Sequence, residues 1–95
     1  MDPDDDRSDN QRVYWHSRRG MLELDLVLMP FAESVYPGLD PESRRRFRAL
    51  LACEDTDLFA WLVHKHSPQE PELARTVREV LGNGRPPSQA GTQGV

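Results

Sequence analysis

The chain has 95 residues, of which 29% are charged and 37% hydrophobic, and its net charge is −4. This length allows one domain at most, which excludes large barrels and two-domain enzymes. No segment approaches the roughly 20 continuous apolar residues of a membrane-spanning helix, so membrane insertion is not expected. The single cysteine, Cys53, excludes a disulfide framework within the chain.

The two ends of the chain show no apolar periodicity. Residues 1–9 carry five aspartates and one arginine and are predicted to form a disordered acidic head. Residues 83–95 are rich in glycine and proline and are predicted to form a flexible tail. The folded domain is therefore expected over residues 10–82, where the charges nearly balance. This balance argues against general nucleic-acid binding, because such binding depends on neutralising phosphates.

The acidic N-terminus also bears on localisation. A secretory signal peptide begins with positive charge followed by an apolar run, and a transit peptide is rich in arginine and serine and poor in acids. Residues 1–6 read Met-Asp-Pro-Asp-Asp-Asp and fit neither pattern. The sequence therefore predicts a cytoplasmic protein.

The first half of the domain is predicted to hold two helices. A short helix is expected over residues 10–18, and a longer one over residues 20–36. The apolar residues of the longer helix form two stripes, one of Leu22, Leu26 and Met29 and the other of Leu24, Leu28, Phe31 and Val35. Two stripes predict a helix that is buried on most sides. Pro30 removes a backbone donor inside this run, so a kink or a break is expected near residues 27–29.

Three further helices have clear N-terminal signals. Asp40-Pro41-Glu42 offers a capping aspartate, a proline at the first helical position and an acid in the first turn. Asp55-Thr56-Asp57 opens the next helix, and Ser67-Pro68-Gln69-Glu70 has the spacing of a capping box for the last one. No segment alternates with a period of two. The expected fold is therefore all-α, a small bundle of about five short helices with disordered termini.

Residue patterns that would indicate catalysis are absent from the sequence. There is no phosphate-binding glycine loop and no nucleophile elbow. His64 and His66 are two residues apart and would point to different faces of a helix, which makes them a poor metal pair. Cys53 has no partner at a catalytic spacing and is predicted to be a small buried or half-buried residue. We therefore assign no catalytic residue, cofactor-binding residue or metal ligand, and an enzyme is not expected.

Two features allow more than one interpretation. The arginines at 44, 45, 46 and 48 form either a surface for an acidic partner or a solvated helix face whose aliphatic stems cover the core. Trp61 lies at the edge of the apolar stripe of its helix. It fits the core and a partner surface equally well, since aromatic anchors are common at interfaces.

Residues 18–25 are the most informative stretch. Gly20 lies at the junction of two predicted helices, where it allows a sharp turn or the close approach of another backbone. Arg19 and Glu23 are four residues apart and, on one helix face, would pair with each other or contact a partner together. Glu23 and Asp25 near a helix start also suit the helix dipole. From the residues alone, a helix start with a surface ion pair and a partner-binding surface both remain open.

Residues 19–25, Arg-Gly-Met-Leu-Glu-Leu-Asp, resemble the R-G-x-x-E motif of the succinate dehydrogenase FAD assembly factors. Met29-Pro30-Phe31 and then Asp55-Thr56-Asp57-Leu58-Phe59-Ala60-Trp61-Leu62 follow in the order and spacing of that family, so the resemblance covers about residues 12–81. It implies a five-helix fold. It also implies a chaperone-like assembly factor that binds the flavoprotein subunit of succinate dehydrogenase, or that of fumarate reductase, and promotes covalent attachment of FAD to it.

The resemblance also implies which residues bind the partner. Arg19, Gly20 and Glu23 are expected to do so, together with Met21, Asp25 and Trp61 as neighbouring positions. FAD would belong to the partner, and the chain, expected to be a monomer, would bind no cofactor stably by itself. An antitoxin-like or regulatory protein-binding module is the alternative function. A small enzyme or flavin carrier is a third, less favoured because the sequence offers no phosphate cradle.

Overall fold

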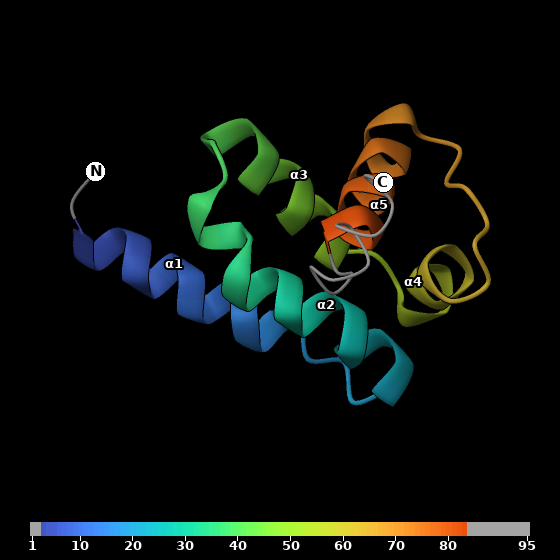
Figure 1. The fold of residues 1–95 in the computed structure, drawn as a ribbon, viewed down its shortest axis with the longest axis horizontal. Helices are drawn as coiled ribbons and strands as arrows, with labels where there is room; N and C mark the ends of the chain where they lie inside the picture. The colour runs from blue at the N-terminus through green and yellow to red at the C-terminus, as the bar shows by residue number, and fades with distance from the viewer. Residues whose placement is uncertain (1–2, 84–95) are drawn as a thin grey trace, which may run out of the picture.

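The computed structural model describes residues 3–83, which form five α-helices and one short 3-10 helix with no strand among them. In chain order these are α1 (Pro3–His16), α2 (Leu22–Ser34), the 3-10 helix η1 (Tyr36–Gly38), α3 (Pro41–Leu51), α4 (Asp55–Leu62) and α5 (Pro71–Asn83) (Figure 1). The predicted all-α bundle of five helices is confirmed over these residues. No helix among them is long and apolar enough to cross a membrane.

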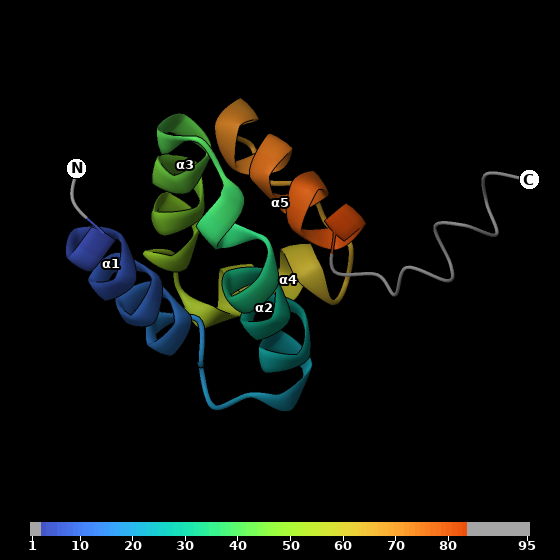
Figure 2. The ribbon, with the colours of Figure 1, turned by 60° about the vertical axis from the view of Figure 1, so that its left-hand side comes forward.

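α2 is the central element of the bundle. It packs against α1 on one side, against α4 and α5 on the other, and against η1 at its C-terminal end (Figures 1 and 2). α3 and α5 lie side by side, as Figure 2 shows. α2 thus contacts the helix that precedes it and several elements that follow it in the chain. These contacts fix the two ends of α2 and therefore the connections that begin there.

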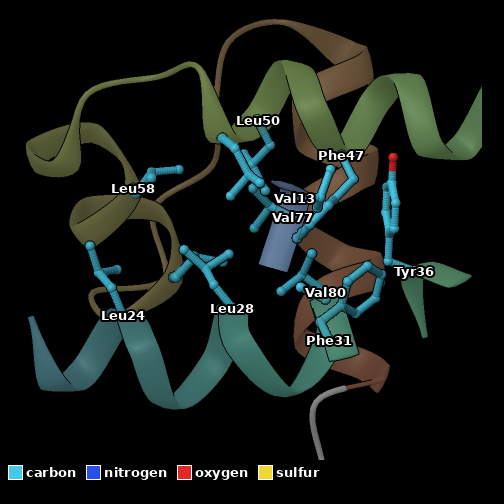
Figure 3. Close-up of a cluster of buried hydrophobic side chains, with 13 residues drawn as sticks. Val13, Leu24, Leu28, Phe31, Tyr36, Phe47, Leu50, Leu58, Val77 and Val80 are labelled. Atoms are coloured by element: carbon cyan, nitrogen blue, oxygen red, sulfur yellow. The ribbon is translucent and has the colours of Figure 1, made fainter. Parts of the chain in front are cut away.

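The core is one cluster of buried hydrophobic side chains to which every helix contributes (Figure 3). Its members are Val13, Leu24, Leu28, Phe31, Ala32, Tyr36, Phe47, Leu50, Leu51, Leu58, Leu62, Val77 and Val80. Phe47 of α3 packs against the ring of Phe31 at 4.9 Å and that of Tyr36 at 5.6 Å between centroids. Burial of each large side chain in such a cluster contributes about 1.5–3 kcal/mol.

α1 begins earlier than the sequence predicts. Residues 3–9, which were expected to be disordered, form the first turns of this helix. Long-range contacts account for the difference, because the Tyr36 hydroxyl donates to Asp9 Oδ2 at 2.6 Å and Arg44 Nη1 donates to Asp6 Oδ1 at 3.3 Å. The remainder of the expected head and tail, residues 1–2 and 84–95, lies outside the described residues.

The predicted start of α3 is confirmed, and that of α5 is wrong. Asp40 Oδ2 accepts a hydrogen bond from the Ser43 amide at 3.4 Å, and this bond lowers the pKa of the Asp40 carboxyl by favouring its charged form. α5 begins at Pro71 rather than at the Ser67–Glu70 capping box. A residue that precedes proline is pushed out of the helical conformation, so Pro71 prevents a helix from running through Glu70.

Pro30 does not break α2, which is helical from Leu22 to Ser34. The hydrogen bond that proline cannot donate would have ended on the carbonyl of Leu26. Pro30 and Leu26 are both exposed, so water can bond to that carbonyl instead. The break expected near residues 27–29 is therefore avoided.

Candidate partner-binding site

The connection between α1 and α2 is held in place by Arg19. Its side chain is 12% exposed and uses four of the five N–H groups of a guanidinium. The acceptors are Asp55 Oδ1 at 2.7 Å and the carbonyl oxygens of His16 at 3.0 Å, Leu51 at 2.9 Å and Cys53 at 3.0 Å. The guanidinium thus ties this connection to the turn between α3 and α4.

Asp25 fixes the same connection from the other side. Its Oδ1 accepts a hydrogen bond from the backbone amide of Arg19 at 2.8 Å, six residues earlier in the chain. Arg19 and Asp25 are therefore occupied in shaping the loop. They position the backbone of residues 20–24, which lies between them in the chain.

The ion pair expected between Arg19 and Glu23 is not formed. α2 begins at Leu22, so Arg19 lies outside the helix and the four-residue spacing does not place the two side chains together. Arg19 pairs with Asp55 instead. The carboxylate of Glu23 is exposed and makes no ion pair with the side chains the structure describes. Sequence reasoning missed Asp55 as the partner, although it opens the third segment of the family resemblance.

Gly20 supplies a backbone conformation rather than space. Its φ is +80°, in the left-handed region that side chains with a Cβ disfavour. A Cβ built at this position would have no neighbour within 4 Å, so nothing in the chain packs closely against it. The sharp turn expected at this glycine is present, and Gly20 is exposed beside the start of α2.

An open hollow of about 400 Å³ lies between the start of α2 and α4. Its lining residues are Met21, Asp55, Thr56, Phe59, Ala60 and His64. Met21 is half-buried and immediately precedes α2. Trp61 is half-buried against the core and does not line this hollow.

α2 buries only one of its two apolar stripes. Leu24, Leu28 and Phe31 are buried, whereas Leu22 is 69% and Leu26 is 64% exposed. The expectation that this helix is covered on most sides is therefore wrong. The neighbouring helices pack on the Leu24–Leu28 side of α2. Of the other stripe, Leu22 and Leu26 stay exposed and Met29 is half-buried.

The arginines of α3 are paired within the fold. Arg44 pairs with Asp6 of α1, Arg45 with Glu42 and Glu72, Arg46 with Glu42 and Glu79, and Arg48 with Asp9. The Arg46 side chain is only 7% exposed, and Arg44 lies over the ring of Tyr36. Acids from α1, α3 and α5 thus neutralise this helix, so it does not present an unpaired basic patch.

The other residues considered for chemistry are two histidines and the cysteine. His64 and His66 lie beyond the end of α4, with 6.3 Å between their ring centroids. His64 and His66 are both exposed, and no group of three or more histidines, cysteines or acids within residues 3–83 could hold a metal ion. Cys53 is half-buried, as predicted, and its Sγ donates to the Ala49 carbonyl at 3.6 Å. Burial raises the pKa of this thiol, which favours the unreactive neutral form.

The helical bundle and this surface together define a small module with a rigidly held loop, an exposed carboxylate and an adjoining hollow. A family model described as "Flavinator of succinate dehydrogenase" matches residues 11–83, and the chain belongs to this family.

Curated relatives agree with this assignment. The chain is 52% identical over 81 residues to the "FAD assembly factor SdhE" of Pseudomonas aeruginosa, which covers 85% of this chain and 96% of the relative. It is 44% identical over 81 residues to the protein of the same name from Pseudomonas putida, again over 85% and 96% of the two chains. It is 48% identical over 75 residues to that of Shewanella oneidensis, over 79% and 92%. These names describe an assembly factor rather than an enzyme.

Proposed function

We propose that this chain binds the flavoprotein subunit of succinate dehydrogenase in the cytoplasm and promotes covalent attachment of FAD to it. Membership of the flavinator family supports the proposal. The structural observation that carries it is the exposed carboxylate of Glu23, which lies in the first turn of α2 directly after the loop that Arg19 holds in place. The helix and the loop fix the backbone on which this charge is carried, so binding a partner requires no ordering of the backbone there.

The six candidate residues divide into three roles under this proposal. Glu23 and Gly20 contact the partner directly, the first by its charge and the second by leaving the backbone accessible. Arg19 and Asp25 position the loop. Met21 contacts the partner as part of the lining of the hollow. Trp61 holds α4 in place by packing against the core.

The chain needs no catalytic group of its own in this function. The flavin bond forms between a histidine of the partner and the FAD that the partner holds. A bound assembly factor accelerates such a step by raising the population of the partner in which the two groups are close and aligned. FAD accordingly belongs to the partner, and the chain acts as a monomer.

The proposal is tested by measuring how much flavin is covalently bound to the partner subunit. In cells that lack the factor and are complemented with variants, Glu23→Ala should lower flavin fluorescence of the denatured subunit by about fivefold or more, since a charged interface contact is lost. Glu33→Ala is the matched control, because Glu33 is also an exposed glutamate of α2 but lies at its other end. Wild-type flavin loading with a well-folded Glu23→Ala protein would contradict the proposal. The same assay on fumarate reductase decides whether its flavoprotein is a second partner.

A further inference from the structure

Exposed large hydrophobic side chains are few in the described part of the chain, and two of the three lie on α2. Leu22 and Leu26 are 69% and 64% exposed, and Trp15 of α1 is the third. Leu22 and Leu26 are four residues apart on one continuous helix, so they lie on the same face and one turn apart. Leu24 and Leu28 occupy the opposite face and fill the core.

Packing of the fold does not account for leucine at positions 22 and 26. Neither side chain belongs to the core cluster or to the partly buried residues packed against it. Single exposed leucines are common on protein surfaces, but this pair is contiguous with the proposed partner-binding loop. Glu23 lies between the two in sequence, and Met21, which precedes Leu22, lines the hollow.

The charges on α2 limit what can cover this pair. Its charged residues are Glu23, Asp25 and Glu33, and it contains no lysine or arginine. A second copy of this chain docked through the same face would bring the acids of one α2 against those of the other, which is unfavourable. The complementary surface is instead an apolar groove with lysine or arginine at its rim.

We propose that Leu22 and Leu26 form an apolar ridge that docks into such a basic-rimmed groove on the flavoprotein subunit, with Glu23 facing the rim. This inference rests on the proposed function and adds the chemistry of the contact. The ridge supplies most of the affinity through desolvation of the two leucines, whereas Glu23 supplies orientation.

Binding of the purified flavoprotein subunit by the full chain tests the ridge, with the dissociation constant measured by calorimetry. The variant Leu22→Gln/Leu26→Gln keeps side-chain size and helix propensity but makes both positions polar, and it should bind roughly 10- to 100-fold more weakly. The matched control Leu22→Met/Leu26→Met keeps both positions apolar and should bind within about threefold of wild type. Both variants should unfold at the wild-type temperature, because neither leucine is in the core.

The outcomes separate the ridge from the proposed function. Wild-type affinity of the Gln variant would overturn the ridge while leaving the function standing, whereas failure of the wild-type chain to bind the subunit would overturn both. Self-association of the wild-type chain that the Gln substitutions abolish would assign the ridge to a dimer and overturn the proposal. An affinity that does not fall when NaCl rises from about 0.05 to about 0.5 M would overturn the basic rim, because exposed charge pairs are screened by salt.

Discussion

Arg19 determines the geometry of the loop that carries the candidate site. Its guanidinium bonds to two carbonyls at the end of α3 and to Asp55 at the start of α4. Lysine keeps the charge but cannot reach several acceptors in a fixed fork. Arg19→Lys should therefore lower the free energy of unfolding in urea by about 2–4 kcal/mol, because part-buried acceptors lose their donors.

Arg18→Lys is the control for this prediction, since Arg18 is exposed and should tolerate the change to within about 0.5 kcal/mol. If Arg19→Lys retained wild-type stability and yet lost binding of the flavoprotein, Arg19 would be a direct contact. The positioning role assigned to it would then be wrong.

Two exposed glycines separate the effect of backbone conformation from that of space. Gly20 has a φ of +80° and Gly38 does not have a positive φ, while a Cβ would have no neighbour within 4 Å at either position. Gly20→Ala should therefore cost about 1–2 kcal/mol of stability in urea. Gly38→Ala should leave stability unchanged or raise it by up to about 1 kcal/mol, because alanine restricts the unfolded chain. Equal effects of the two substitutions would refute the conformational role of Gly20.

Among the elements, α1 and α3 are joined by a polar cluster around Tyr36. The Tyr36 hydroxyl donates to Asp9 at 2.6 Å and accepts from Arg48 Nη1 at 2.9 Å. Burial, followed by the hydrogen bond to Asp9, raises the pKa of Tyr36 above its ordinary value near 10. The cluster is therefore built for the neutral phenol.

This raised pKa gives a pH dependence with a definite sign. A group whose pKa is higher in the folded state contributes stability that is complete below its unfolded pKa and is lost as the pH rises through the folded value. The free energy of unfolding should therefore decline as the pH rises above about 10, and Tyr36→Phe should reduce the steepness of this decline. Urea titrations at several pH values measure both proteins. The same slope for wild type and Tyr36→Phe would exclude Tyr36 as a source.

The helix starts show how far local signals reach. The start of α3 was predictable because the hydrogen bond from Ser43 to Asp40 and the proline at Pro41 all lie within three residues of one another. The capping-box spacing of Ser67 and Glu70 was misleading, because Pro71 has the stronger local effect on the residue before it. The helicity of residues 3–9 was not predictable from local sequence, since its support comes from Tyr36 and Arg44 in distant segments.

At the scale of the whole molecule, the helix N-termini bear on whether the chain holds flavin itself. A pyrophosphate is commonly bound at a helix N-terminus, where backbone amides and the helix dipole attract anions. The first turns of α2, α3, α4 and α5 all contain acids, which repel phosphate. The purified chain should therefore retain no FAD after dialysis and show no flavin absorbance. A stoichiometric flavin spectrum would instead support a flavin carrier.

The sequence by itself determined the all-helical class, most of the helices and the stretch in which the candidate site lies. Apolar spacing and helix caps act over four residues or fewer, so they can be read from neighbours in the chain. The tertiary structure decided how the site is built. In the folded chain Arg19 pairs with Asp55, 36 residues away, rather than with Glu23. Leu22 and Leu26 are left exposed. Both outcomes depend on which helices pack together, because an apolar stripe is buried only where another element covers it and a guanidinium bonds to whichever carbonyls the packing brings within reach.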